Sequence, residues 1–256
     1  IPHLSLELPE EDAPFRHKNF VPSCLRGKKV FHIAVIAYPR LSNHDDIDPL
    51  ASESGVNLRF VRSTDELQPA DLIILPGSKH VVSDLEWLRE NSFAAAIEKH
   101  LRYGGKLLGI CGGMQMLGSF ISDDGIEGGN AEGLSWLPLS TTMQEEKTLR
   151  QVDQPASAFG DVRVTGYEIH HGASDENVNL FPFAACSMDK QVWGTYLHGL
   201  FEQGAFRQAW LASVGFHASD GQDQQQRTLA SLDLLADALE RNIAADLLQP
   251  LLKKRR

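Results

Sequence analysis

The stretch from Lys106 to Gly118, KLLGICGGMQMLG, constrains the fold most strongly. Its first part, Leu107 to Ile110, is a short apolar run that predicts a buried strand, and the residues after Gly113 begin a helical pattern. Cys111 lies where the strand would turn into the helix. A nucleophile at such a turn forms a nucleophile elbow, and small neighbours are needed because the backbone there is crowded. On this stretch alone, Cys111 is either a nucleophile or a buried structural cysteine.

Apolar runs and helical patterns alternate on either side of this stretch. Strands are expected at residues 30–37, 58–61, 72–75 and 107–110, with helices near 46–55, 82–89 and 93–103. Such alternation predicts an α/β fold with a mostly parallel central sheet flanked by helices. The loops that follow parallel strands meet at one rim of the sheet, so the turn at 76–79 and Cys111 are expected to share that rim.

The second half of the chain has a different pattern. Short runs at 134–138, 149–152, 162–169, 184–187 and 192–197 predict an additional, partly antiparallel strand region. Helices are expected at 205–214 and 225–248. The last of these carries an apolar face, which predicts packing against the core rather than against a partner. That face consists of Leu229, Leu232, Leu235, Leu239, Ile243 and Leu247.

Composition narrows the function classes. The net charge of −10 argues against a nucleic-acid partner, and no apolar run approaches the roughly 18 residues that span a bilayer. The three cysteines make no disulfide framework, which predicts a reducing, cytoplasmic location. No metal-ligand spacing is present. Residues 1–28 are interpreted as a linker or the tail of a preceding domain, 29–250 as the main domain, and 251–256 as a basic tail.

A nucleophilic Cys111 would need a base and an oxyanion site. His198 is the first candidate base, because it ends the strand-like run 192–197 and is followed by Gly199. The segment 166–172, GYEIHHG, is the second candidate region. Alternation there places Tyr167, Ile169 and His171 on one face of a strand, and Glu168 and His170 on the other.

Backbone amides are the candidate oxyanion donors. One is expected from Gly112, directly after the nucleophile. The other is expected from Gly77 or Ser78, because Pro76 makes a rigid turn at the neighbouring strand end.

Four segments together resemble one family. GICGGMQMLG (109–118) is similar to the elbow of class I glutamine amidotransferases, which have a flavodoxin-like α/β fold. LPGSKHVVSDL (75–85), GYEIHHG (166–172) and GTYLHGLFE (194–202) narrow the resemblance to the carboxyl-terminal amidotransferase domains of the cobyric acid synthase family. The opening residues, IPHLSLELPEEDA, resemble the end of that family's ATP-binding domain and its linker.

The resemblance implies a glutaminase mechanism. Cys111 would attack the amide carbon of glutamine, His198 would carry the proton, and the Gly77 and Gly112 amides would hold the oxyanion. Gln115 and Ser78 match positions near bound glutamine. Tyr167 and Glu168 belong to a family motif near the site, and their roles stay open.

The resemblance also implies partners outside this chain. Ammonia would pass to an amino-terminal synthetase domain that amidates corrinoid carboxylates. ATP and magnesium are expected on that domain, because the sequence has no GxxxxGK[ST] phosphate-binding loop. The chain itself is expected to need no cofactor.

Three positions depart from the family pattern. Many class I domains carry a glutamate two residues after the histidine, where this chain has Leu200. His198 would then act in a dyad, or be oriented by Glu168, by Glu202 or by a backbone carbonyl, with Glu202 the candidate orienter. His80 and Met114 stand where the family would have Asn and Tyr.

Two alternative functions remain open at this stage. The first is the glutaminase subunit of a cell-wall (lipid II) amidotransferase, whose motifs are related. The second is a non-catalytic docking module that keeps the fold, an alternative that Leu200 leaves open.

Overall fold

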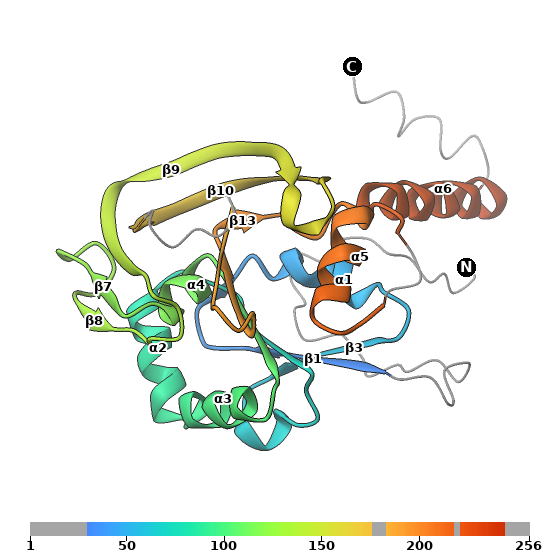
Figure 1. Cartoon of the computed structure of the whole chain (residues 1–256). Helices are drawn as coiled ribbons and strands as arrows, with labels where there is room; N and C mark the ends of the chain where they lie inside the picture. The colour runs from blue at the N-terminus through green and yellow to red at the C-terminus, as the bar shows by residue number, and fades with distance from the viewer. Residues whose placement is uncertain (1–29, 176–182, 218–220, 244–256) are drawn as a thin grey trace.

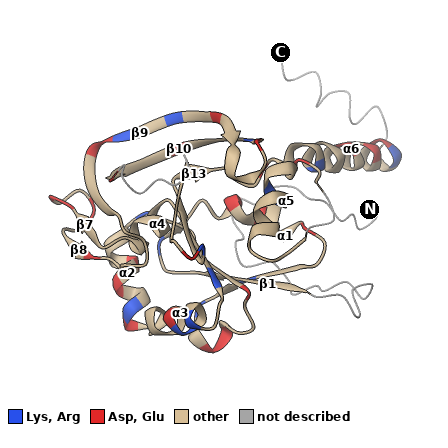
Figure 2. Cartoon of the chain, viewed as in Figure 1, with Lys and Arg blue, Asp and Glu red and all other residues tan. Residues whose placement is uncertain are grey.

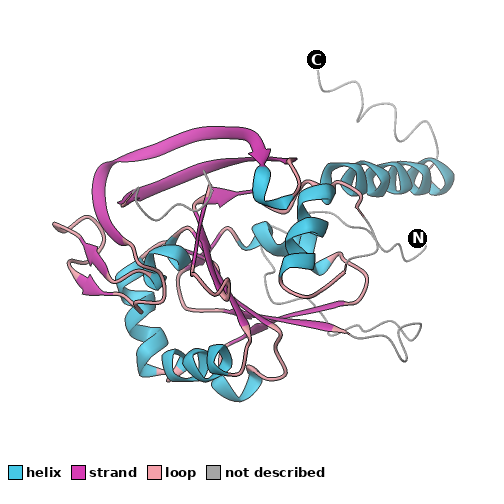
Figure 3. Cartoon of the chain, in the orientation of Figure 1, coloured by secondary structure: helices cyan, strands magenta, loops and turns pink. Residues whose placement is uncertain are grey.

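The computed structural model describes residues 30–175, 183–217 and 221–243 (Figure 1). The predicted linker 1–28, the basic tail 251–256 and the end of the last predicted helix lie outside these ranges. The described chain forms a central sheet with helices on both faces and a second sheet above the carboxyl ends of its strands (Figure 3). The predicted α/β architecture is therefore confirmed.

The central sheet has six strands in the order β11-β12-β6-β4-β1-β3. All neighbours are parallel except the edge pair β11 and β12. The strands are β1 (Phe31–Ile36), β3 (Val56–Val61), β4 (Leu72–Leu75), β6 (Lys106–Ile110), β11 (Ala184–Cys186) and β12 (Val192–Thr195). Four of them, β1, β3, β4 and β6, match predicted runs. β4 and the run 107–110 in β6 contain no polar residue, because central strands covered on both faces need no polar side.

Helices cover both faces of this sheet. Ile33 and Val35 of β1 pack with α1 and α5 in one core, whereas Ala34 and Ile36 pack with α2, α3 and α4 in another. The helices are α1 (Asp48–Ala51), α2 (Val81–Glu90), α3 (Phe93–Arg102), α4 (Gly112–Leu117), α5 (Gly204–Ser213) and α6 (Gln224–Asn242). Short 3-10 turns are η2 (His44–Ile47), η3 (Thr64–Glu66) and η4 (Ser157–Phe159).

The second sheet has the order β13-β10-β9-β7-β8 and is mostly antiparallel. Its long strands β9 and β10 arch above the carboxyl end of the central sheet (Figure 3). Its strands are β7 (Phe120–Ser122), β8 (Ala131–Glu132), β9 (Ser140–Ala156), β10 (Val162–Ser174) and β13 (Leu197–His198). A further pair joins β2 (Leu41–Ser42) to β5 (Gly77–Ser78).

Two predicted elements differ in the structure. The expected strand at 134–138 is a loop, because Leu134, Trp136 and Leu137 donate backbone hydrogen bonds to the carbonyls of Met116 and Leu117 at the end of α4. Those carbonyls lack partners within the helix, so the apolar run closes a helix end instead of joining a sheet. The expected helix at 46–55 is the short η2 and α1, which end at Ala51.

The prediction for the last helix is half right. α6 forms, but its leucines do not pack into the core: Leu229, Leu232 and Leu239 are exposed, and its buried residues are Arg227, Ser231 and Ala238. None of the helices that the structure describes is long and apolar enough to cross a membrane.

Candidate active site

Cys111 occupies the sharp turn between β6 and α4. Its backbone has φ 51° and ψ −112°, an unusual conformation for a residue with a side chain. Two glycines allow the turn: a Cβ on Gly113 would lie 2.0 Å from the Leu75 carbonyl oxygen, and one on Gly109 would lie 2.7 Å from the Gly113 backbone. The predicted strand–turn–helix elbow is thus present, with Cys111 half-buried at the rim of the sheet.

His198 is buried at the end of β13 and held by a carboxylate. Its Nδ1 lies 2.6 Å from Oδ2 of Asp46, and Oδ1 of Asp46 accepts a hydrogen bond of 2.9 Å from the Gly199 amide. Tyr167, opposite His198 in the β10–β13 pair, stacks on the imidazole with ring centroids 5.2 Å apart. Both the rotation and the position of the ring are therefore fixed.

The surroundings of His198 favour its protonated form. Burial lowers its pKa, but the hydrogen bond to Asp46 and the interactions with Asp46 and Cys111 outweigh burial and raise the pKa to about 10. Because Asp46 occupies Nδ1, Nε2 is the ring atom left for the cysteine. Nε2 is buried and has no hydrogen-bond partner among the described residues.

The carboxylate that orients His198 is Asp46, so the expectation of Glu202 is wrong. The Glu202 side chain is largely exposed, and partial desolvation of its carboxylate, together with the nearby charges of Asp45 and Asp46, raises its pKa. Sequence reasoning missed Asp46 because 152 positions separate it from His198. A signal was available: the polar loop that contains Asp46 follows the first predicted strand, and it therefore lies at the same rim as Cys111.

Glu168, the other candidate orienter, is held by different partners. Its carboxylate accepts hydrogen bonds of 2.7 and 2.9 Å from Arg150 and lies 3.6 Å from Nε2 of His170. Burial raises the pKa of Glu168, but the bonds to His170 and Arg150 outweigh it and lower the pKa to about 2. Glu168 and His170 share one face of β10, as alternation predicts.

β10 reaches the nucleophile through its backbone. The Ile169 carbonyl oxygen lies 3.8 Å from Sγ of Cys111. Further along β10, Gly172 lies against the Gln115 side chain, and a Cβ there would be 2.3 Å from Nε2 of Gln115. A side chain at position 172 would therefore force Gln115 or Thr141 to shift.

Gln115 is buried on the first turn of α4. Its Nε2 donates a hydrogen bond of 3.3 Å to the Tyr196 hydroxyl, which lies 2.7 Å from Oγ of Ser174. Its Oε1 is buried without a partner among the described residues. An unsatisfied buried acceptor costs free energy, so this oxygen is a candidate for contact with a bound molecule.

The two expected oxyanion segments lie side by side. A Cβ on Gly112 would be 3.0 Å from the Ser78 backbone nitrogen, and one on Gly77 would be 3.0 Å from the Ser42 carbonyl oxygen. The Ser78 hydroxyl donates a hydrogen bond of 2.6 Å to Asp84. The backbone of Ser78 thus faces the elbow, while its side chain holds the α2 helix.

His80 and Met114, which depart from the family pattern, are part of the framework. Nδ1 of His80 accepts a hydrogen bond of 3.3 Å from the Ser83 amide and caps α2. Met114 is buried, and its Cγ lies 2.7 Å from where a Cβ on Gly194 would be. Each side chain is therefore fixed by packing or capping beside the site.

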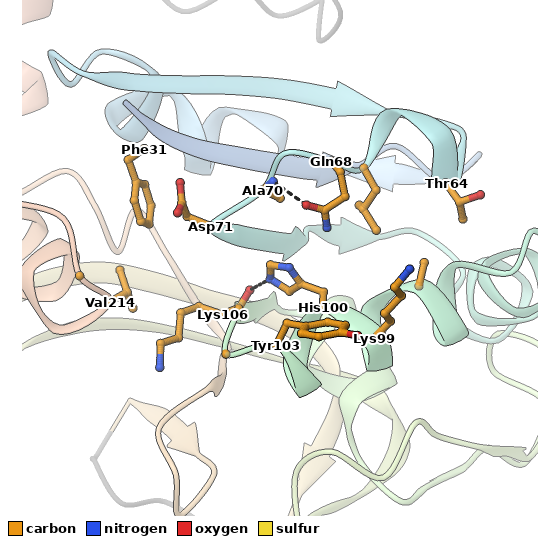
Figure 4. Close-up of a pocket in the computed structure, with 15 residues that line it drawn as sticks. Phe31, Thr64, Gln68, Ala70, Asp71, Lys99, His100, Tyr103, Lys106 and Val214 are labelled. Carbon is orange, nitrogen blue, oxygen red and sulfur yellow. Dashed lines mark hydrogen bonds between the residues drawn. The ribbon is translucent and has the colours of Figure 1, made fainter. Parts of the chain in front are cut away.

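The described residues also form a cavity that lies away from Cys111. A cavity of about 580 Å³ lies where β1, β4 and β6 begin, at the end of the sheet opposite the elbow (Figure 4). Asp71, Lys99 and Lys106 line it, and His100 Nε2 lies 3.0 Å from the Lys106 carbonyl oxygen. Within the ranges that the structure describes, no three His, Cys, Asp or Glu side chains could together hold a metal ion.

The sequence is similar to a known family of domains and to a curated protein. Residues 32–206 match the model of the CobB/CobQ-like glutamine amidotransferase domain, a span that contains Asp46, Cys111 and His198. A cobyric acid synthase from Halorhodospira halophila (strain DSM 244 / SL1) is 51% identical over 237 residues, which are 92% of this chain and 48% of that protein. The chain therefore spans about half the length of this relative.

Two solved structures share the fold. PurLQS from Thermotoga maritima has a TM-score of 0.50 at 20% identity, covering 79% of this chain and 99% of the matched chain. A structure described as a glutamine amidotransferase has a TM-score of 0.51 at 16% identity, covering 72% and 99%. These likenesses confirm the predicted fold class.

Proposed function

Because the chain belongs to the family of CobB/CobQ-like glutamine amidotransferase domains, we propose that it hydrolyses glutamine at Cys111. One observation carries the proposal: a cysteine on a strained elbow interacts with a buried histidine that Asp46 holds. The pKa of His198, raised to about 10, indicates that the imidazolium is its resting form. An imidazolium stabilises a thiolate, which is the nucleophilic form of cysteine.

The chemistry follows from these groups. The Cys111 sulfur attacks the amide carbon of glutamine, and the carbonyl oxygen becomes an oxyanion that the Gly77 and Gly112 amides stabilise. His198 donates its Nε2 proton to the departing nitrogen, ammonia leaves, and a glutamyl thioester remains. His198 then takes a proton from water as the water attacks the thioester, which releases glutamate and the thiolate. Asp46 fixes the tautomer of the ring and stabilises its charge.

Glutamine recognition is proposed for the groups beside the elbow. The unpartnered Oε1 of Gln115 is an acceptor for the substrate's ammonium group, and the Ser78 amide is a neighbouring donor. Tyr167 is proposed as a cover on His198, since its ring stacks on the imidazole. Glu168 holds Arg150 and supports β10, over which the substrate would lie.

The likeness to cobyric acid synthase supports a more specific role. We propose that the ammonia serves ATP-dependent amidation of corrinoid carboxylates by a synthetase domain in the remaining half of such a protein. ATP and magnesium are proposed to bind there. We further propose a cytoplasmic location, since a free cysteine nucleophile needs a reducing compartment.

A pair of cysteine variants tests the proposed function. Cys111→Ser should reduce glutamate release from glutamine by roughly a thousandfold or more, because the nucleophile is lost. Cys186→Ser is the matched control: Cys186 is buried in β11, and burial raises its pKa to about 11, so activity should stay within about twofold. Release that survives Cys111→Ser would reject Cys111 as the nucleophile. Folded wild-type protein that releases no more glutamate than Cys111→Ser would instead favour a non-catalytic module.

A further inference from the structure

α6 carries an apolar stripe that nothing in the described chain covers. Leu229, Leu232 and Leu239 are 55%, 45% and 38% exposed, and Leu235 beside them is half-buried. Their spacing places all four on one side of the helix. The helix extends away from the sheets at the edge of the molecule (Figure 1). Contiguous exposed apolar side chains of this kind mark interaction sites.

The helix is nevertheless firmly anchored at its first turn. Nη2 of Arg227 lies 3.1 Å from Oε1 of Glu53, and the same oxygen lies 2.6 Å from Nε of Arg207 on α5. The Glu53 and Arg207 side chains are fully buried. The exposure of the stripe is therefore not the result of a loosely attached helix, because a buried ion network fixes where α6 starts.

We propose that this stripe docks the remaining half of the longer synthetase onto the glutaminase domain, a proposal that rests on the proposed function. The family model ends at residue 206, before α6. The match to the H. halophila synthase covers 237 of the 256 residues, so only 19 lie outside it and it must include most of α6. That relative has as much chain again beyond the match. α6 thus lies outside the amidotransferase family model but inside the region of sequence similarity to the complete synthase.

The charges beside the stripe define the chemistry of the partner surface. Asp233, Asp237 and Glu240 are exposed and border the stripe along one side, and both signs of charge occur on α6 (Figure 2). Arg241 offsets part of this charge through its 2.7 Å pair with Asp237. The expected partner is an apolar protein surface with lysine or arginine along the matching edge.

The same charges disfavour two other occupants. An anionic lipid surface attracts basic helices, whereas this border is acidic. A second copy in an antiparallel twofold pair would bring the acidic border of each helix against its own equivalent, because such an interface is isologous. The synthetase half is therefore the occupant that the observations favour.

The docking test uses the complete synthetase that carries this domain. Leu232→Glu combined with Leu239→Glu should reduce glutamine-dependent amide synthesis by about tenfold or more. Ammonia-dependent synthesis and glutamate release without ATP should stay within about twofold, since neither leucine touches the catalytic groups. Met188→Glu, which changes a fully exposed apolar residue in the β11–β12 turn, is the matched control and should leave all three rates unchanged.

A second readout does not depend on activity. Backbone amides of α6 should exchange hydrogen more slowly in the complete synthetase than in this chain alone, and the paired leucine variant should remove the difference. Equal exchange in the two proteins, or an unchanged glutamine-dependent rate, would overturn the proposal. A concentration-dependent dimer of this chain that the leucine variant abolishes would also overturn it in favour of a second copy. Failure of the proposed function would instead appear as glutamate release that survives Cys111→Ser.

Discussion

At the scale of single residues, the largest difference between the predicted and the observed site is Asp46, which holds His198. The resemblance left a gap behind the histidine, where Leu200 replaces an expected glutamate. The structure places a carboxylate there from another part of the chain, with 2.6 Å between Oδ2 of Asp46 and Nδ1 of His198. The same geometric role is thus served from a different position, as it is in unrelated hydrolases.

Asp46→Asn tests this role in the pH dependence of glutamine hydrolysis. The pKa of His198 is about 10 because Asp46 and Cys111 outweigh burial, so removal of the carboxylate should lower that pKa. The alkaline limit of kcat should move to lower pH, and kcat should fall on the order of a hundredfold. Glu202→Gln is the control and should leave the profile in place. A profile that moves with Glu202 and not with Asp46 would contradict the assignment.

Protein stability offers an independent check of the same contact. A histidine whose pKa rises on folding from 6.5 to about 10 stabilises the fold fully below pH 6.5, and this contribution is lost as pH rises through 10. The difference in free energy of unfolding between the wild type and Asp46→Asn should therefore be largest at pH 6.5 and shrink toward pH 10. Urea unfolding at several pH values measures it, and a difference that grows with pH would be inconsistent with the contact.

At the scale of elements, the sequence predicts best where local pattern and burial agree. β4 and α3 follow their predicted ranges closely, because one is apolar throughout and the other is amphipathic and ends near a glycine. The strand prediction for 134–138 is wrong because backbone amides of this segment donate hydrogen bonds to carbonyls at the end of α4, a long-range contact that no local pattern reveals. α6 was placed correctly, but its leucines lack a partner within the described chain.

The elbow itself makes an element-scale prediction about glycine. Gly113→Ala would place a Cβ 2.0 Å from the Leu75 carbonyl oxygen, so either β4 or α4 must shift. We expect a loss of about 3 kcal/mol in the free energy of unfolding, together with lost activity. Gly104→Ala is the control, since its Cβ meets nothing within 4 Å and only its φ of +86° is unfavourable, at a cost of about 1 kcal/mol. Equal losses would show that contact with β4 is not what requires Gly113.

At the scale of the whole molecule, one buried ion network joins distant parts of the chain. Glu53 follows α1, Arg207 lies on α5 and Arg227 on α6, and Arg207 also donates a hydrogen bond of 2.6 Å to the Phe201 carbonyl oxygen. The network connects the helix proposed for docking with the segments that carry Asp46 and His198. The sequence could not predict it, because its members are charged residues scattered over more than 170 positions.

Glu53→Ala should therefore destabilise the molecule strongly. Two arginines would remain buried without their carboxylate, which typically costs about 3–5 kcal/mol. Asp237→Ala is the control because it removes an exposed ion pair with Arg241, and it should cost less than about 0.5 kcal/mol. Denaturant unfolding measures both variants. Similar small losses would mean that the network does not hold these helices together.

The central claim is that Cys111 forms a thioester with glutamine. A glutamine-analogue diazo-ketone offers the most direct measurement, since its electrophilic carbon sits where the amide carbon would be and reacts only with a positioned nucleophile. Peptide mapping by mass spectrometry after treatment near neutral pH should find the adduct on Cys111 alone, with protection by excess glutamine. An adduct on Cys186, or no adduct on Cys111 in folded protein, would contradict the account.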